Sequence, residues 1–146
     1  MQFRQTTQQD VALVTEITRA AYTPWIAVIH REPLPMQVNY AEAIAQHRID
    51  ILENPDPVAL IEMIPQADHL WLENLAVPPD HQGKGLGHHL ITHATDIAHS
   101  LRLPELRLLT NAAFTINLRF YTQQGFTQTE TRPFKQGFTA YFTKRL

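Results

Sequence analysis

The residues best suited to chemistry form a glycine-rich run, Gln82-Gly83-Lys84-Gly85-Leu86-Gly87. The apolar stretch before it, residues 69–77, predicts a β-strand, and residues 87–101 have a helical period. Glycines at alternate positions let the backbone bend sharply and bring its N–H groups close to a ligand. The helix that follows adds unpaired N–H groups and the positive end of its dipole. This arrangement predicts a site for an anion such as phosphate.

The spacing of the run separates it from two common phosphate-binding motifs. A P-loop requires Ser or Thr after its lysine, but Gly85 follows Lys84, and a dinucleotide fingerprint reads G-x-G-x-x-G rather than G-x-G-x-G. The alternative that remains is a plain helix start whose glycines serve packing only.

The pattern Q-x-x-G-x-G directly after L-A-V-P-P resembles the pyrophosphate loop, [Q/R]-x-x-G-x-[G/A], of the GNAT superfamily of N-acetyltransferases. A second family feature is a helix that ends in a tyrosine, followed by a Gly-Phe pair. Residues 117–126, NLRFYTQQGF, are similar to it. The resemblance covers residues 58–146, whereas the first half matches only the family's element order.

Composition limits the function classes. The 146 residues have the size of one domain, and the resemblance implies that residues 1–146 form a single N-acetyltransferase domain. A formal net charge of −2 indicates no nucleic-acid partner. The chain has no cysteine, which excludes disulfides, thiolate metal sites and a cysteine nucleophile. The polar N-terminus predicts neither a signal peptide nor a membrane span, so a cytoplasmic protein without membrane contacts is expected. A homodimer is left open.

The element pattern predicts an α/β (α+β) protein, and the resemblance implies the GNAT acyl-CoA N-acyltransferase fold. Strands are predicted at residues 2–5, 49–53, 58–64, 69–77, 106–109, 126–134 and 138–145, and helices at 8–22, 40–47, 87–101 and 114–124. Short turns between strands indicate a mostly antiparallel, mixed sheet of six to seven strands, flanked by about four helices. Residues 106–109 should lie parallel to the preceding strand through helix 87–101. This helix is expected to bury Leu90, Ala94, Ile97 and Leu101, while residues 25–38 are expected to be irregular.

The resemblance implies acetyl-CoA as co-substrate, held where the fourth and fifth strands splay apart. The backbone N–H groups of the loop would bind the pyrophosphate, and the strand end would pair with the pantetheine arm as an added strand. Core packing explains the strand end equally well. Asn111 could simply cap a helix, and Asn117 could be an exposed helical residue. The expected cofactor-binding residues are Leu75, Ala76, Val77, Gln82, Gly83, Lys84, Gly85, Leu86, Gly87, His88, Asn111, Asn117, Phe120 and Tyr121.

Two residues are candidates for proton transfer. By resemblance, Tyr121 stands near the sulfur and could donate a proton to the leaving thiolate. The alternative is a half-buried tyrosine that only fixes packing. Glu73 could act as general base through a water, or it could be an exposed strand residue. In a regular strand Asn74 would point to the opposite face from Glu73.

The acceptor pocket is expected in the first half of the chain, because the second half holds the cofactor. Tyr22, Trp25, Met36 and Tyr40 could form its wall, although core packing explains them as well. His89, His93 and Asp96 share a helix flank but lack the H-E-x-x-H pattern, and no metal is expected.

The function predicted is transfer of an acetyl group from acetyl-CoA to a primary amine of a small molecule or peptide, directly in a ternary complex. The alternative is a non-catalytic acyl-CoA-binding regulatory domain, which needs the loop but neither Tyr121 nor a base. The sequence leaves open a longer acyl donor.

Overall fold

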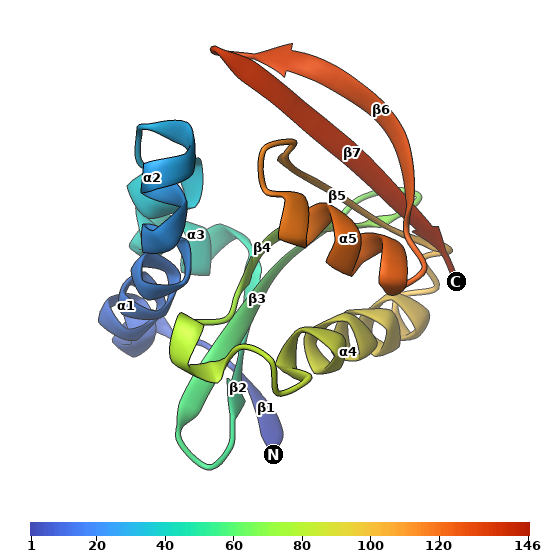
Figure 1. Cartoon of the computed structure of the whole chain (residues 1–146). Coiled ribbons are helices and arrows are strands. Elements are labelled where there is room, and N and C mark those ends of the chain that lie inside the picture. Colours follow the sequence, from blue (N-terminus) through green and yellow to red (C-terminus); the bar gives the residue numbers. More distant parts are fainter.

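A seven-stranded mixed sheet runs through the molecule in the order β1-β2-β3-β4-β5-β7-β6 (Figure 1). The computed structural model describes all 146 residues. The strands are β1 (Gln2–Gln5), β2 (Arg48–Glu53), β3 (Pro57–Pro65), β4 (Leu70–Ala76), β5 (Glu105–Asn111), β6 (Thr127–Phe134) and β7 (Gly137–Arg145). The α-helices are α1 (Val11–Tyr22), α2 (Ile26–Ile29), α3 (Tyr40–Gln46), α4 (Leu86–Ser100) and α5 (Thr115–Gln123). The predicted fold class is confirmed.

Only β4 and β5 are parallel, and they pair over just two residues. Leu70 lies opposite Leu106 and Trp71 opposite Arg107, after which the strands separate. Beyond this point β4 continues its ladder with β3, and β5 continues with β7. One edge of β4 therefore carries backbone groups without a strand partner, at the position where the splay was predicted.

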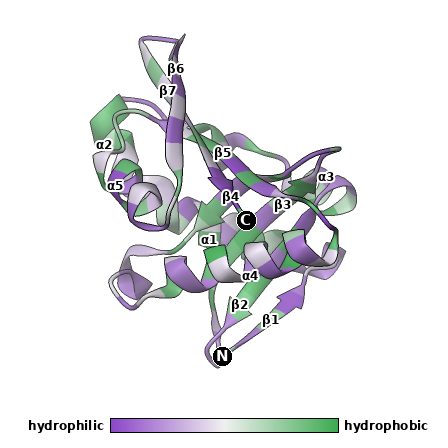
Figure 2. Cartoon of the chain, turned by 90° about the vertical axis from the view of Figure 1, so that its right-hand side faces the viewer, coloured by the Kyte–Doolittle hydropathy of each residue, from purple (hydrophilic) through white to green (hydrophobic).

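Helices cover both faces of the sheet (Figure 1). The larger core, of 19 buried residues, includes side chains of α4 and α5, whereas a core of nine buried residues joins α1 and α3 to the other face. The β6–β7 hairpin extends from the body, and every residue of β6 is exposed. Figure 2 accordingly colours the central strands green and β6 largely purple to white. The apolar side chains thus gather where the sheet is covered on both sides.

Local signals place several helix ends. Thr7 and Asp10 form a capping box before α1, through a 3₁₀ turn at Gln8–Asp10. The Asn39 side chain accepts hydrogen bonds from two N–H groups of α3. Gly125, just beyond α5, has a φ of 94°, which a residue with a side chain rarely adopts. Each of these residues is of a type that commonly begins or ends a helix.

Two expectations about helices are wrong. Residues 25–38, expected to be irregular, contain the short helix α2 and a 3₁₀ turn, η3 (Leu34–Gln37). Of the residues expected to be buried on this helix, Ile97 is only partly buried, and Leu101 is 49% exposed because α4 ends before it. Leu86, Ile91 and Ala98 complete the buried face instead. Helix-period arguments misplace a terminal residue when the helix stops even one residue early.

None of the helices combines the length and the hydrophobicity that a bilayer span requires.

Candidate active site

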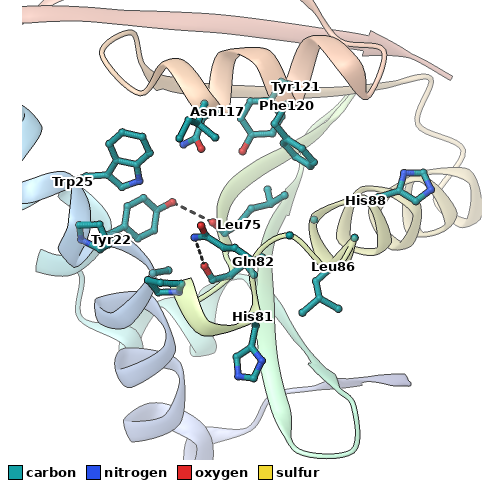
Figure 3. A pocket seen from close by; sticks show the side chains of 18 of the residues that line it. Tyr22, Trp25, Leu75, His81, Gln82, Leu86, His88, Asn117, Phe120 and Tyr121 are labelled. Atoms are coloured by element: carbon teal, nitrogen blue, oxygen red, sulfur yellow. Dashed lines mark hydrogen bonds between the residues drawn. The ribbon is translucent and has the colours of Figure 1, made fainter.

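The splay between β4 and β5 opens into a cavity of about 680 Å³ (Figure 3). Four parts of the chain line it: the end of α1 with the turn into α2, the end of β4, the glycine loop with the start of α4, and one face of α5. Because these parts are far apart in sequence, the cavity exists only in the folded chain. Its size is within the range of small-molecule and cofactor sites.

The glycines of the loop have two different functions. Gly83 and Gly85 have φ values of 76° and 78°, and a Cβ added at either would meet no atom within 4 Å. They therefore serve the backbone turn and leave its surface open to a ligand. Gly87 is helical, and a Cβ there would lie 2.8 Å from Cζ of Phe120. The absence of a side chain at Gly87 thus lets the Phe120 ring of α5 lie close against α4.

The N-terminus of α4 is open. Gly85 is its N-cap residue and has no side chain to accept a hydrogen bond from the first turn, so no side chain caps the helix. The first free N–H groups and the positive dipole end of a 15-residue helix face the cavity from the loop. Lys84 is exposed and does not line the cavity. At the cavity wall the loop therefore offers backbone N–H groups rather than the Lys84 ammonium, an arrangement that favours an anionic ligand.

Gln82 lines the cavity, and its side chain also ties the loop to the strand. Its Nε2 donates to the carbonyl oxygen of Val77 over 2.9 Å, as the dashed line in Figure 3 shows. This bond fixes the loop against the end of β4. Leu86 is 5% exposed and anchors the first turn of α4 in the core. The loop is thus held at both ends, which keeps its N–H groups in one arrangement.

Tyr121 reaches the cavity from α5, beside Asn117 and Phe120 (Figure 3). Its ring is packed at 5.2 to 5.8 Å from the rings of Phe120, Phe126 and Phe142. The residue is 8% exposed, and its hydroxyl makes no hydrogen bond within the protein, although no fully buried polar side-chain atom lacks a partner. The hydroxyl therefore faces the cavity. Burial raises the pKa of Tyr121 well above its ordinary value of 10, so the phenol stays protonated.

Tyr22 and Trp25 line the cavity from the opposite side. Oη of Tyr22 donates to Oδ1 of Asn74 over 2.9 Å and lies 3.3 Å from the carbonyl oxygen of Leu75. The ring of Trp25 stacks on Phe114 with the centroids 4.2 Å apart. Both side chains are held in place by the β4 and β5–α5 segments. They form the wall opposite Tyr121.

Met36 and Tyr40, predicted as acceptor-site residues, do not line the cavity. They are 6% and 3% exposed and belong to the interior. Nδ2 of Asn74 donates to Thr18 Oγ1 and Tyr40 Oη, at 3.3 and 3.4 Å, and Tyr40 Oη donates to the carbonyl of Pro35 over 2.7 Å. Burial raises the pKa of Tyr40 to about 12. Tyr40 thus supports the position of Tyr22 through Asn74 rather than forming the wall itself.

Glu73 lies in a β-bulge. The β3–β4 register passes from the pair Glu62–Asn74 to the pair Met63–Leu72, so Glu73 is the extra residue. The expected alternation between Glu73 and Asn74 assumed a regular strand and does not apply. The Glu73 carboxylate accepts a hydrogen bond from Trp71 Nε1 over 2.6 Å and is exposed outside the cavity wall.

The remaining residues predicted to bind the cofactor differ in whether they line the cavity. Leu75 and Val77 line the cavity, but Ala76 is fully buried in the core with α1. Asn111 lies outside the cavity, and its Oδ1 accepts from Ala113 N over 2.9 Å in the turn before α5. His88, for which only a backbone role was expected, lines the cavity and places Nδ1 2.8 Å from Gln124 Oε1. This contact joins two elements, and helix periodicity gives no signal for it.

The histidines of α4 do not gather around a metal position. Nε2 of His93 lies 2.6 Å from Oδ2 of Asp50, and the His93 ring stacks on Phe3 at 3.8 Å. No three His, Asp or Glu side chains converge in a geometry that could hold a metal ion. His93 therefore belongs to the packing between α4 and the first strands.

The split sheet, the uncapped helix and the glycine loop define the acyl-CoA N-acyltransferase class of folds. The model of the Acetyltransferase (GNAT) family matches residues 13–126, which is most of the chain. The protein therefore belongs to the GNAT acetyltransferase family. Among curated proteins, none matches the sequence.

Solved structures agree with the fold. The PaiA N-acetyltransferase from Thermoplasma acidophilum, in complex with coenzyme A, has 17% identity and a TM-score of 0.85, with coverage of 99% of this chain and 98% of that one. A GNAT acetyltransferase from Elizabethkingia anophelis with bound acetyl-CoA has 15% identity and a TM-score of 0.74, with coverage of 99% of this chain and 97% of that one. The ribosomal-protein-S18-alanine N-acetyltransferase from Escherichia coli has 19% identity and a TM-score of 0.78, with coverage of 99% of this chain and 92% of that one.

Proposed function

We propose that the protein transfers an acetyl group from acetyl-CoA to a primary amine of a small molecule or peptide, directly in a ternary complex. The observation that carries the proposal is one cavity in which three features meet: the unpaired edge of β4, the uncapped N-terminus of α4 and the free hydroxyl of Tyr121. A phosphate site, a strand-like edge and a hydrogen-bond donor are what a thioester of coenzyme A needs. Solved structures of the same fold contain coenzyme A or acetyl-CoA.

The cofactor is proposed to lie along the splay. Its pyrophosphate accepts hydrogen bonds from the N–H groups of residues 83–88, where the helix dipole favours negative charge. The pantetheine amides pair with the free edge of β4 at Leu75 and Val77, in the manner of an added strand. Asn117 and Phe120, on α5, face the same cavity and contact the arm from the other side.

The transfer step balances without an external reagent. The amine lone pair attacks the thioester carbon, a C–N bond forms, and the tetrahedral intermediate collapses with loss of the C–S bond. The nitrogen gives up a proton, and the thiolate of coenzyme A takes one up. Because a thiol of this kind has a pKa near 8.5 and the phenol of Tyr121 a much higher one, Tyr121 acts mainly by hydrogen bonding to the departing sulfur.

Removal of the amine proton is proposed to involve Glu73 through water. Its carboxylate stands outside the cavity wall and is held by Trp71, so direct contact with the amine is not supported. A water between the two groups would bridge them. If the amine instead loses its proton to bulk solvent, turnover will be independent of Glu73.

The proposal is tested by thiol release from acetyl-CoA with a panel of primary amines, together with mass spectrometry of the products and calorimetry of acetyl-CoA binding. We expect micromolar-to-millimolar acetyl-CoA binding and amine-dependent thiol release with a mass gain of one acetyl group. Binding without release from any amine would favour the regulatory domain. A longer acyl donor that outcompetes acetyl-CoA would correct the donor while retaining the reaction.

A further inference from the structure

A second cavity, of about 720 Å³, adjoins the first. Three turns form it: the end of α2 with residues 29–31, the turn after β5 with residues 111–113, and the β6–β7 turn with residues 135–138. Val28 lines both cavities, so they share a wall. In Figure 1 the β6–β7 hairpin extends above the end of the sheet that α2 flanks. The two cavities are therefore adjacent at Val28.

The ionisable residues that line this second cavity are all basic. They are His30, Arg31 and Lys135, and no Asp or Glu lines it. None of the three forms an ion pair with a carboxylate anywhere in the protein, although most other arginines do. The Arg31 guanidinium lies 5.9 Å from the centroid of Phe134, and the Lys135 ammonium lies 5.7 Å from the same centroid. Both cations therefore lie within 6 Å of the same aromatic ring, and neither is neutralised by a carboxylate.

The backbone at this cavity is also unusual. His30 and Lys135 have φ values of 59° and 53°, a region that residues with a Cβ seldom occupy. Such conformations persist where the surrounding structure fixes them, and they are common in binding sites. They set the directions in which the two basic side chains leave their turns.

We propose that this cavity binds an anionic group on the acceptor, so that the favoured substrates are amines whose other end carries a carboxylate or a phosphate. The inference rests on the proposed N-acetyltransferase function and adds a substrate class to it. Arg31 and Lys135 bind the anion through charge-assisted hydrogen bonds, while the amine extends past Val28 to the thioester carbon. The anion is unchanged in the reaction, and only the amine exchanges a proton for an acetyl group.

The test compares matched acceptors with the full-length enzyme. ω-Amino acids from β-alanine to 6-aminohexanoate are paired with their carboxamides, and phosphoethanolamine is paired with ethanolamine. We expect kcat/KM for at least one anionic series to exceed that of its neutral partner by about tenfold or more. The carboxylate and phosphate arms identify the preferred anion. The preference should weaken as salt is raised, because the basic side chains are reached by solvent.

Two variants remove the charge from the cavity. Arg31→Gln and the double variant Arg31→Gln/Lys135→Gln should reduce the anionic-to-neutral ratio about tenfold, with acetyl-CoA affinity unchanged. Arg102→Gln is the matched control, because Arg102 is exposed, lines neither cavity and, like Lys135, has a positive φ. It should leave the ratio unchanged. Comparing ratios cancels differences in amine pKa between acid and amide.

A binding measurement separates this inference from the proposed function. In the presence of coenzyme A, NMR titration with 6-aminohexanoate should shift the signals of Arg31 and Lys135, whereas 6-aminohexanamide should not. Equal use of charged and neutral amines, or a preference that persists in the double variant, would overturn the inference and leave the acetyltransferase function standing. Loss of thiol release with every amine would instead contradict the proposed function. Absence of shifts with both the acid and phosphoethanolamine would again overturn the anion site.

Discussion

Tyr121 combines burial of its ring with a hydroxyl that has no partner in the protein. Packing alone would require only the ring, which contacts three aromatic neighbours. The free hydroxyl at the cavity is the feature that packing does not explain. At the residue scale this is the strongest sign of a chemical role.

Tyr121→Phe separates packing from chemistry. Phenylalanine keeps the ring contacts and removes only the oxygen, so the fold and acetyl-CoA binding should change little, within a few-fold. We expect kcat to fall about 10²-fold, as is usual when a general acid or its equivalent is lost. Steady-state turnover and calorimetry measure the two effects. If Tyr121→Phe keeps wild-type turnover, Tyr121 is a packing residue. If the variant loses most of its affinity for acetyl-CoA, Tyr121 is a cofactor-binding residue.

Glu73 is tested through its pH dependence. If it accepts the amine proton through water, Glu73→Gln should lower turnover most near neutral pH and less as free amine becomes abundant at higher pH. The ratio of wild-type to variant kcat/KM across pH 6 to 9.5 reports this. A constant ratio would indicate that the bulge or the Trp71 contact, rather than proton transfer, is what the substitution disturbs.

At the scale of elements, the site depends on how the glycine loop joins β4 to α4. Gly85 is the N-cap of α4, in a left-handed conformation and open to the cavity. A carboxylate there would face the position proposed for the pyrophosphate. The same conformation accepts Asp and Asn better than other residues with side chains, so the fold should tolerate either.

Gly85→Asp is therefore expected to lower acetyl-CoA affinity by more than tenfold, or more than about 1.4 kcal/mol. Gly85→Asn is the matched control, since it has nearly the same size and backbone preference without the charge. It should lose distinctly less affinity. Calorimetry measures the acetyl-CoA affinity of both variants. Equal affinities for wild type and Gly85→Asp would contradict the proposal that the loop binds the pyrophosphate.

Gly87 tests the contact between α4 and α5. An added Cβ would lie 2.8 Å from Cζ of Phe120, but this atom is the outer end of a partly exposed ring that can shift. Alanine also gains about 1 kcal/mol of helix propensity over glycine, which offsets the strain. Gly87→Ala should thus change the free energy of unfolding by less than about 1 kcal/mol.

The displaced Phe120 ring in Gly87→Ala should narrow the cavity and weaken acetyl-CoA binding several-fold. Urea unfolding and calorimetry together check this pair of expectations. Phe120→Leu combined with Gly87→Ala should recover part of the affinity if the ring is the cause. A large loss of stability with normal acetyl-CoA affinity would contradict this expectation. It would show that the added methyl group disturbs the packing of α4 against α5 and leaves the cavity unchanged.

The elements themselves could be predicted where local chemistry decides them. Thr7, Asn39 and Gly125 cap or end helices through their own side chains or conformations, and residues of these types are local signals that a sequence displays. The bulge at Glu73 could not be predicted, because it depends on the register with β3 rather than on Glu73 itself. For Met36 and Tyr40 the sequence leaves a cavity wall and core packing equally open, because aromatic and apolar residues look alike in both until tertiary contacts are known. The structure places both residues in the core.

For the whole molecule, a buried acid couples stability to pH. Glu62 on β3 has a side chain that is 3% exposed, and its Oε2 lies 2.6 Å from Nδ1 of His47. Burial raises the pKa of Glu62 above its ordinary value of 4.5, and the contact with His47 opposes this only in part. Since the folded-state pKa is above the unfolded one, the contribution to stability is present below about pH 4.5 and is lost as pH rises through the folded-state pKa.

Glu62→Gln should remove this loss. Relative to wild type, the variant should gain stability between pH 4 and pH 7, because glutamine does not ionise, and the exposed Glu16→Gln substitution on α1 serves as the control. Urea unfolding at several pH values gives the free energy of unfolding for each. A parallel pH dependence in wild type and Glu62→Gln would mean that another group governs this range.

The central claim is that the cavity between β4 and β5 holds acetyl-CoA in one defined arrangement. A crystal structure of the protein with acetyl-CoA tests it most directly. The account predicts the pyrophosphate on the N–H groups of residues 83–88, the pantetheine paired with β4 at Leu75 and Val77, and the sulfur within about 3.5 Å of the Tyr121 hydroxyl. A cofactor bound elsewhere, or one whose thioester lies away from Tyr121 with no contact to β4, would contradict it.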